Sequence, residues 1–239
     1  MIGVFDSGVG GLSSYRELKR LLPSEDIIYL ADRRNAPYGT KDRDTVLKYT
    51  RNNIKALRER GARHILIACC TASSVFPLLE PEERRQITPI ISPAAEAALT
   101  HGKRVAVIAT EQTVRSHAFR EAALAKNPDA KVFELATQIL VSLVELGARD
   151  GELLPREGDL LDKIAGELRA YKPDSLILGC THFSYLGGEL QARLPGVTII
   201  DAAVIGARTL VERISDTCKR ERGITIYTEG LKRQELTEL

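Results

Sequence analysis

The feature that most constrains the fold of this chain is a series of short, nearly continuous apolar runs, separated by longer amphipathic stretches. Continuous runs, as opposed to alternating ones, are typical of parallel strands that are covered on both faces. The runs predict strands at Ile2–Phe5, Ile27–Leu30, Ile65–Ala68, Pro89–Ile91, Val105–Ala109, Val132–Leu135, Leu176–Leu178, Val197–Ile200 and Ile224–Tyr227.

The stretches between these runs carry apolar residues three to four positions apart, which is the spacing of one helix face. This spacing predicts helices over Leu12–Leu22, Val46–Leu57, Val114–Ala125, Gln138–Leu146, Leu160–Ala170, Gly187–Arg193 and Ala203–Arg213. The 239 residues, 44% of them hydrophobic, are enough for one large domain or two small ones with a real core. Alternation of strand and helix predicts an α/β fold with a mostly parallel sheet.

Two pairs of segments resemble each other across the chain. HILIACCTASS and SLILGCTHFS each place a cysteine and a threonine after a strand, and VFDSG and VIATEQT each end a strand with hydroxyls and an acid nearby. We therefore expect two similar α/β halves, each offering one loop with a cysteine. The boundary is expected near Ser92–Gly102, where Pro93 and His101-Gly102 interrupt the pattern.

Charge and hydropathy exclude several classes of protein. The net charge is +2 with basic and acidic residues interleaved, so we expect neither a nucleic-acid partner nor a membrane surface. No apolar run is long enough to span a membrane, and the first residues do not resemble a signal peptide. We expect a cytoplasmic protein whose cysteines (Cys69, Cys70, Cys180 and Cys218) are reduced.

Chemically useful residues cluster just after the predicted strands. In open α/β sheets, ligands bind beyond the carboxyl ends of the strands. The segments at those ends are Asp6-Ser7-Gly8, Asp32 with Pro37-Tyr38-Gly39, Cys69-Cys70-Thr71, Thr110–Thr113 and Cys180-Thr181-His182.

The turn DSGVGG, residues 6 to 11, has two interpretations. Its glycines could let backbone N–H groups approach an anion, or they could simply form a tight turn between strand and helix. Neither GxGxxG nor a Walker ending is present. Asp6 in this turn could cap the following helix, or it could manage a proton beside a reactive group.

A cysteine at a helix N-terminus meets a positive dipole, which lowers the thiol pKa. Cys69 alone could equally be a buried, inert thiol. Cys180, however, stands in the equivalent place and is followed by Thr181-His182, so the two thiols could face one ligand from opposite sides. The spacing of these cysteines does not fit a zinc site, and a Cys–His hydrolase would leave the second cysteine without a role.

The remaining histidines and charged runs carry less information. His64, His101 and His117 are expected to have surface or capping roles. Arg33-Arg34 and the Glu82–Arg85 run are interpreted as solvated charge.

Six motifs together resemble the glutamate racemase family, within the wider aspartate/glutamate racemase group. They appear in the order typical of that family and cover nearly all of the chain. The motifs are IGVFDSGVGGL (2–12), YLAD…PYGTK (29–41), IACCTASS (67–74), VAVIATEQTVRS (105–116), LVSLVELG (140–147) and LILGCTHF (176–183).

The resemblance implies a cofactor-independent amino-acid racemase, an isomerase, that supplies D-glutamate for bacterial peptidoglycan. It implies two α/β domains, residues 1–95 plus 206–239 and residues 96–205, with the active site between them, and a homodimer. Cys69 and Cys180 would be the acid/base thiols, assisted by Asp6 and His182. The substrate site would be lined by Ser7, Pro37, Tyr38, Gly39, Cys70, Thr71, Thr110, Thr113 and Thr181. No cofactor and no metal are expected.

Two departures from the family affect these expectations. The family has Cys-Asn-Thr where this chain has Cys69-Cys70-Thr71, and a thiol is a poor hydrogen-bonding replacement for the substrate-contacting amide. The family often has Cys-Pro where Thr137-Gln138 stand here. A racemase for aspartate or another amino acid, or a catalytically silent amino-acid-binding homologue, therefore remains an alternative.

The chemistry of racemisation supports the two-thiol interpretation. Inverting a stereocentre at Cα requires proton removal on one face and proton delivery on the other, and two bases do this without crossing the plane. Because neighbouring residues point in different directions, we expect Cys69 and not Cys70 to act with Cys180. The glycine-rich helix starts and the Thr/Ser set would hold the substrate carboxylate.

Overall fold

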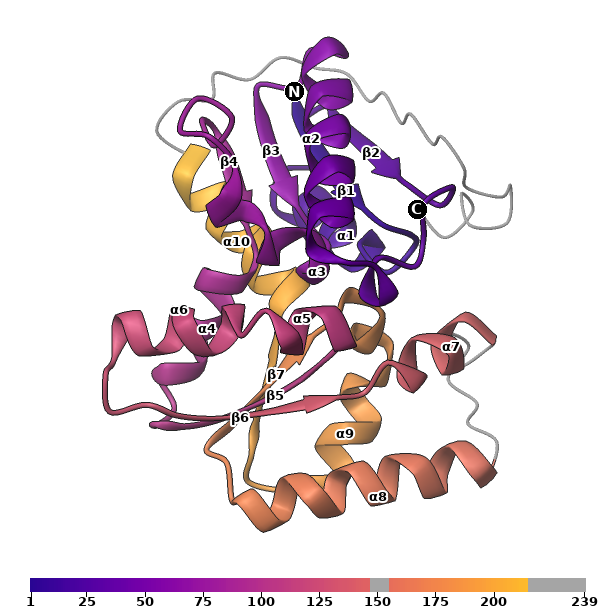
Figure 1. The fold of residues 1–239 in the computed structure, drawn as a ribbon, viewed down its shortest axis with the longest axis vertical. Coiled ribbons are helices and arrows are strands. Elements are labelled where there is room, and N and C mark those ends of the chain that lie inside the picture. The colour runs from indigo at the N-terminus through magenta and orange to yellow at the C-terminus, as the bar shows by residue number, and fades with distance from the viewer. Residues whose placement is uncertain (147–154, 215–239) are drawn as a thin grey trace.

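The structure is a computed structural model that describes residues 1–146 and 155–214. Its strands form two sheets, each of four strands and each flanked by helices, in two lobes stacked one above the other in Figure 1. The first lobe is built around the sheet with strand order β2-β1-β3-β4, and the second around the sheet β6-β5-β7-β8. All of the strand pairs are parallel, which confirms the predicted α/β class.

The two sheets have the same topology. Each begins with a strand that pairs on one side with the next strand of the chain and on the other with the third. The first sheet contains β1 (Ile2–Asp6), β2 (Ile27–Ala31), β3 (His64–Ile67) and β4 (Ile87–Pro89); the second contains β5 (Arg104–Ala109), β6 (Lys131–Ala136), β7 (Ser175–Gly179) and β8 (Thr198–Asp201). The internal similarity therefore has a structural basis: β3 and β7, which precede the two cysteine loops, are equivalent strands.

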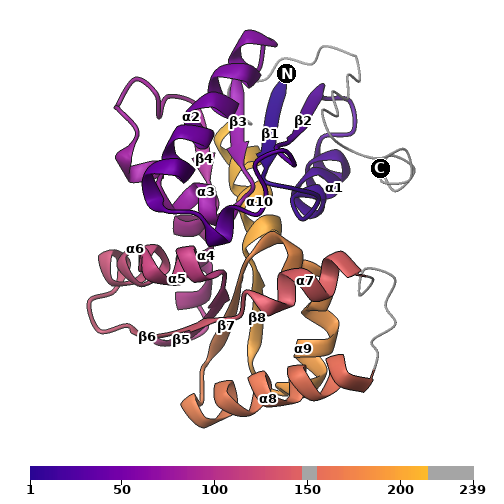
Figure 2. The same ribbon diagram turned by 45° about the vertical axis from the view of Figure 1, so that its right-hand side comes forward.

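Helices cover both faces of each sheet (Figure 2). The described helices follow one another along the chain in this order: α1 (Leu12–Leu21), η1 (Tyr38–Thr40), α2 (Arg43–Glu59), α3 (Cys70–Ser74), η2 (Phe76–Leu78), α4 (Ile91–Leu99), α5 (Glu111–Arg115), α6 (Ala118–Lys126), α7 (Ile139–Leu146), α8 (Pro155–Tyr171), η4 (Thr181–Leu186), α9 (Gly187–Arg193) and α10 (Ala202–Ile214). Strands β1, β2 and β7 are buried along their whole length because helices cover both of their faces.

Helices α4 and α10 each pack on the sheet of the other lobe. Helix α4 follows β4 of the first sheet, yet it packs on β7 and β8 and beside α6 of the second lobe. Helix α10 follows β8 of the second sheet and returns along α1, β3 and β4 of the first lobe (Figure 1). A single cluster of buried side chains, including Leu12, Ile90 and Ile177, therefore runs from one lobe into the other.

The strand predicted at Pro89–Ile91 is wrong in its bounds. Strand β4 runs from Ile87 to Pro89, and helix α4 begins at Ile91. Pro89 has no N–H to donate, which suits the end of an edge strand. Pro93, read as an interruption, lies in the first turn of α4, where a missing N–H costs no helical hydrogen bond. Helix α4 therefore occupies the region where a domain boundary was predicted.

The single helix predicted over Val114–Ala125 is in fact two. Helix α5 ends at Arg115 and α6 begins at Ala118, because His117 between them adopts a left-handed backbone conformation with φ of 52°. The strand predicted at Ile224–Tyr227 lies outside the described residues. The predicted domain limits stay a prediction; the limit at residue 206 falls inside α10.

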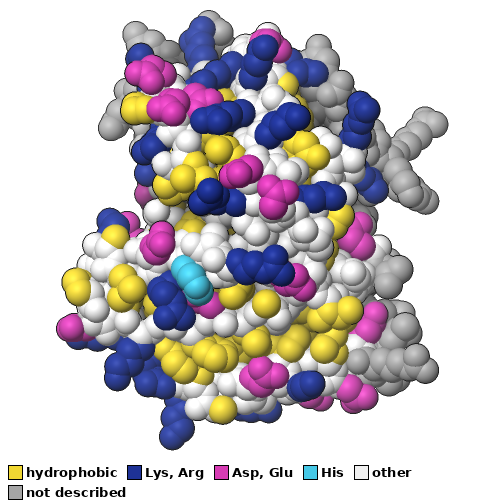
Figure 3. All heavy atoms as spheres, viewed as in Figure 1, with side chains coloured by type: hydrophobic (Ala, Val, Ile, Leu, Met, Phe, Trp, Pro, Cys, Tyr) yellow, Lys and Arg dark blue, Asp and Glu magenta, His cyan; other side chains and the backbone are white. Residues whose placement is uncertain are grey.

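The surface carries basic and acidic side chains interleaved over both lobes, as Figure 3 shows for one face. In the described ranges, none of the helices is long and apolar enough to cross a membrane.

Candidate functional site

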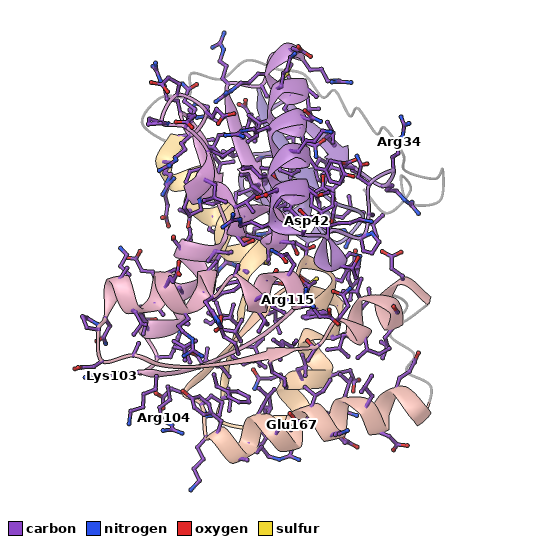
Figure 4. The ribbon with its side chains drawn as sticks, in the orientation of Figure 1. Arg34, Asp42, Lys103, Arg104, Arg115 and Glu167 are labelled. Atoms are coloured by element: carbon purple, nitrogen blue, oxygen red, sulfur yellow. The ribbon has the colours of Figure 1, made fainter. Side chains whose placement is uncertain are left out.

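The carboxyl ends of the strands in both sheets point toward the junction of the lobes. Figure 4 shows this for β5: Arg104, at its amino end, lies far from the first lobe, whereas Arg115, just beyond its carboxyl end, lies close to it. Because the sheets are parallel, the loops after β1, β3, β5 and β7 meet at this junction. Asp6 at the end of β1 and Cys69, Thr110 and Cys180 just after β3, β5 and β7 are therefore brought to it.

A cavity of about 540 Å³ lies at this junction and is lined from both lobes. Its wall contains most of the predicted site residues: Ser7, Pro37, Tyr38, Gly39, Cys69, Cys70, Thr71, Thr110, Cys180, Thr181 and His182. It also contains Gly8 and six residues that were not predicted to belong to the site, namely Arg33, Ala36, Gln138, Val141, Ser142 and Glu145. Asp6 and Thr113 lie directly behind the wall.

Cys69 stands at the N-cap position of α3, in extended conformation. Its side chain is 5% exposed, and its Sγ lies 3.6 Å from the Oγ of Ser7, toward which it can donate. Burial, together with the nearby carboxylate of Asp6, raises the pKa of the Cys69 thiol to about 12. The backbone N–H of Ala72 in the first turn of α3 acts to lower this pKa, but burial and Asp6 outweigh it, so the expected net lowering is wrong.

Asp6 is completely buried at the end of β1. Its Oδ2 accepts a hydrogen bond from the backbone N–H of Gly8 at 3.0 Å, and its Oδ1 accepts one from the hydroxyl of Thr181 at 3.2 Å. The interpretation of Asp6 as a helix cap is wrong, since Gly11 holds the N-cap position of α1 and no side chain makes a capping hydrogen bond there. Asp6 instead links the two lobes beside Cys69.

Glycine is required in the 6–11 turn for close approach between the lobes. A Cβ on Gly10 would lie 2.5 Å from the Oγ1 of Thr181 and 2.7 Å from the backbone N of His182. The turn can therefore press directly against the loop that carries Cys180. Ser7 and Gly8 of the same turn line the cavity.

Cys180, His182 and Glu145 form a chain of polar contacts in the second lobe. The Sγ of Cys180 lies 3.8 Å from Nδ1 of His182, and Nε2 of His182 lies 2.6 Å from Oε1 of Glu145. Burial acts to lower the pKa of His182, but the Cys180 sulfur and the Glu145 carboxylate outweigh it and raise the pKa to about 10. His182 is therefore held as an imidazolium between two negatively charged or polarisable partners.

Three threonine hydroxyls form a closed cluster that spans the junction. The Oγ1 of Thr71 lies 3.0 Å from that of Thr110 and 3.1 Å from that of Thr113, which are themselves 2.8 Å apart. All three residues are buried. Thr71 and Thr110 line the cavity, so either hydroxyl can donate to a bound anion only by turning its single proton away from the cluster.

The Tyr38-Gly39 segment is held by a network behind the wall. The hydroxyl of Tyr38 donates to Oδ2 of Asp32 and accepts from Nδ2 of Asn53 at 2.9 Å. Burial and the Asp32 carboxylate raise the pKa of Tyr38, so this hydroxyl stays protonated. The peptide bond between Ala36 and Pro37 is cis. The network fixes the segment so that it lines the cavity.

Cys70 differs from Cys69 in its surroundings although both line the cavity. Cys70 packs with the buried cluster shared by the lobes, whereas Cys69 packs with a separate cluster of the first lobe. Burial raises the pKa of the Cys70 thiol well above its ordinary value. The two neighbouring thiols thus extend toward different parts of the molecule.

Several cavity residues were missed or misjudged from the sequence. Arg33, interpreted as solvated charge, lines the cavity. Glu145 belongs to the LVSLVELG motif, but its helical spacing alone gives no sign that it reaches His182. Within residues 1–146 and 155–214, no three His, Cys, Asp or Glu side chains are grouped so that they could hold a metal ion.

Comparison with known proteins identifies relatives of this chain in sequence and in structure. Residues 2–210 match the family described as Asp/Glu/Hydantoin racemase. A glutamate racemase of Gloeobacter violaceus is 35% identical over 223 residues, which are 92% of this chain and 83% of that protein. The crystal structure of a glutamate racemase from Bacillus anthracis is similar, with a TM-score of 0.87 and 27% identity over 97% of this chain and 89% of the other. A Francisella tularensis glutamate racemase, solved with D-glutamate, gives a TM-score of 0.84, with 28% identity over 99% and 90% of the two chains.

Proposed function

The chain belongs to the Asp/Glu/hydantoin racemase family, and we propose that it interconverts L- and D-glutamate by moving a proton at Cα between Cys69 and Cys180. The observation that carries this proposal is the position of the two thiols. They follow equivalent strands of two lobes with the same topology, and they line one cavity. Relatives that share this fold are named glutamate racemases, and one of them was solved with D-glutamate bound.

In the proposed reaction, one sulfur is a thiolate and takes the Cα proton of the substrate. The electron pair left on Cα is delocalised into the α-carboxylate, and the thiol on the opposite face then donates its proton to Cα. Each turnover therefore leaves one thiolate and one thiol, with their roles exchanged. The reverse direction uses the same two groups and needs no external oxidant or acid.

The two sulfurs have different surroundings. The high pKa of Cys69, caused by burial and by Asp6, keeps this sulfur protonated at neutral pH. Protonated His182 beside Cys180 provides the positive charge that a thiolate at position 180 needs. We propose that Asp6 and His182, with Glu145 behind it, manage the protons of the two thiols.

Carbanion formation at Cα also requires that the substrate carboxylate be neutralised by preorganised donors. Backbone N–H groups of the loops after the strands and the hydroxyls of Ser7, Thr71 and Thr110 can serve this purpose in the wall, whereas the hydroxyl of Thr181 already donates to Asp6. No lysine is found among the described residues that line the cavity, and a Schiff base with pyridoxal phosphate would require one. The proposed reaction accordingly uses only side chains and backbone of this chain.

The replacement at position 70 favours a second candidate, a racemase for aspartate or another amino acid. Cys70 cannot supply the two donors and the acceptor of a side-chain amide, so contact with the substrate differs from that expected of the family. A silent homologue that binds an amino acid without exchanging its Cα hydrogen is the alternative outside enzymes.

One assay distinguishes these candidates. The protein is incubated in D₂O with a panel of L- and D-amino acids, and deuterium at Cα is measured by mass spectrometry. Glutamate should incorporate deuterium fastest, and Cys69→Ser or Cys180→Ser should abolish interconversion of its enantiomers. Full activity in a Cys69→Ser, Cys180→Ser double variant would disprove the two-thiol mechanism, and faster exchange with aspartate would identify the second candidate.

The cellular role is part of the same proposal. D-glutamate made by this chain would supply peptidoglycan synthesis, which places the enzyme in the bacterial cytoplasm. A homodimer is proposed from the resemblance to the family, and sedimentation of the full chain would test it.

A further inference from the structure

Arg33 is the one lysine or arginine among the described residues that line the cavity. Its side chain is only partly exposed, whereas that of the next residue, Arg34, is exposed and lies at the outer edge of the first lobe in Figure 4. The proposed proton transfer gives Arg33 no role. A guanidinium on the wall of a ligand cavity is nevertheless the group that best binds a carboxylate, because its planar N–H donors match the two carboxylate oxygens.

The backbone that carries Arg33 is fixed beside the turn after β1. Asp6 and Ala31 are paired at the carboxyl ends of β1 and β2, and the N–H of Asp32 donates to the carbonyl of Asp6 at 2.9 Å. Arg33 then begins a turn in which its carbonyl accepts a hydrogen bond from the N–H of Ala36 at 3.3 Å. The base of this long side chain therefore has a defined position at the edge of the cavity.

The order of the strands places Arg33 and the catalytic loop of the first lobe on opposite sides of β1. In the sheet β2-β1-β3-β4, the loop after β2 carries Arg33, and the loop after β3 carries Cys69 and Thr71. Neighbouring strands lie about 4.8 Å apart, so the two loops leave the sheet roughly 10 Å from each other. An extended dicarboxylic amino acid with its α-carboxylate near Thr71 can therefore direct its second carboxylate toward the side chain of Arg33.

The charges of the wall also leave the second carboxylate to Arg33. Glu145 carries a carboxylate of its own, and His182 has both ring nitrogens engaged, one with the sulfur of Cys180 and one with Glu145. The hydroxyls beside the thiols are assigned to the α-carboxylate. Among the described residues of the wall, Arg33 adds the only positive charge that the proposed reaction does not already use.

We propose that Arg33 is a specificity-determining residue whose guanidinium binds the side-chain carboxylate of the substrate. This inference rests on the proposed function, in which the two thiols set the position of Cα. The guanidinium donates two parallel hydrogen bonds to the two carboxylate oxygens. A side-chain amide, as in glutamine, has one acceptor oxygen and turns its own N–H₂ donors toward those of the arginine, so it is bound more weakly.

The test compares glutamate with glutamine, which has the same shape without the charge, in the full chain. Arg33→Met removes the guanidinium and keeps most of the aliphatic stem. We expect KM for glutamate to rise about 10- to 100-fold, with kcat within about threefold of the wild type, because hydrogen bonds to a charged group are lost. The inhibition constant of glutamine, measured against glutamate, should change less than about threefold.

Two further variants serve as controls. Arg33→Lys keeps the charge without the paired donors and should have a KM for glutamate between those of Arg33→Met and the wild type. Arg34→Met removes a neighbouring arginine that is exposed and does not line the cavity, so KM for glutamate should stay unchanged.

The inference is overturned if Arg33→Met keeps KM for glutamate within about twofold. It is also overturned if glutamate and glutamine are weakened by the same factor, since Arg33 would then act on the α-carboxylate or on the fold. If the wild type exchanges no Cα hydrogen of glutamate, the proposed function fails, and calorimetric titration with glutamate then tests Arg33 by binding alone. Absence of binding to the wild type would overturn both.

Discussion

The carboxylate of Asp6 accepts a hydrogen bond from the hydroxyl of Thr181, a residue 175 positions away in the other lobe. This contact places a buried negative charge from the first lobe beside the loop that carries Cys180. The same charge raises the pKa of Cys69. One carboxylate therefore acts on the proton of one candidate catalytic thiol and on the position of the loop that carries the other.

Alkylation should distinguish the two thiols. Cys69 and Cys180 are 5% and 7% exposed, so access alone does not separate them. Since the thiolate is the nucleophile, the raised pKa of Cys69 predicts that iodoacetamide at pH 8 modifies Cys180 first. Peptide mass spectrometry over time would measure both rates.

The Asp6→Asn variant should speed the alkylation of Cys69, because the neighbouring negative charge is removed. Asp42→Asn is a matched control, since Asp42 caps α2 through the N–H of Thr45, is exposed and does not line the cavity. Equal rates for Cys69 in wild type and Asp6→Asn would contradict the assigned electrostatic role.

Stability should depend on pH through His182. Its pKa in the folded protein is raised to about 10, above the value of about 6.5 for an unfolded chain. A group with a raised folded pKa stabilises the protein fully below pH 6.5 and loses this contribution as the pH rises toward 10. The difference in melting temperature between wild type and His182→Gln should therefore shrink between these two pH values. His101→Gln, at an exposed position, should show no such trend.

Gly10 should tolerate no side chain. The Cβ of Gly10→Ala would overlap the Oγ1 of Thr181 and the backbone of His182, so the loops must separate. We expect a loss of about 1–3 kcal/mol in the free energy of unfolding and a strong loss of activity. Gly188→Ala, where no heavy atom lies within 4 Å of the new Cβ, should be neutral or slightly stabilising. Chemical denaturation would measure the free energy of unfolding of both variants and of the wild type. A Gly10→Ala variant as stable as the wild type would contradict the close contact between the loops.

Cys70→Asn tests the identity of the substrate. If glutamate is native, the added amide should raise kcat/KM for glutamate about tenfold, the effect of one hydrogen bond to a charged group. Cys70→Ala adds no donor and should give no gain. The variants are compared with glutamate and aspartate in the exchange assay, and a gain confined to aspartate would favour the second candidate.

The sequence predicted best those site residues that directly follow a strand. Cys69, Cys180 and Thr110 follow apolar runs directly, and parallel sheets bring such positions to one edge. Glu145 and Gln138 lie on or before α7, whose apolar spacing resembles any amphipathic helix. Local pattern cannot show that one reaches His182 and the other Gly39, because the first contact depends on how α7 packs within the second lobe and the second on how the two lobes meet.

The same limit explains the errors. Asp6 resembles a helix cap because its sequence neighbours are those of a turn, while its partner Thr181 is far away in the chain. The expected effect of a helix dipole on Cys69 omitted burial, which no single motif reveals. The crossing of α4 was not predicted, since this helix follows its strand as in any α/β unit. The predicted grouping of residues 206–239 with the first domain came from the family resemblance and not from the local pattern.

The exchange of α4 and α10 between the lobes means that neither half of the chain is a self-sufficient folding unit. A fragment ending after α4 would keep a helix whose apolar face belongs on the other sheet, and would lack the helix that shields its own. Two such halves could nevertheless assemble by trading these helices. The protein is an intertwined pair of structural repeats in one polypeptide. If the chain were cut between the repeats, we expect the two fragments to stay associated through the exchanged helices.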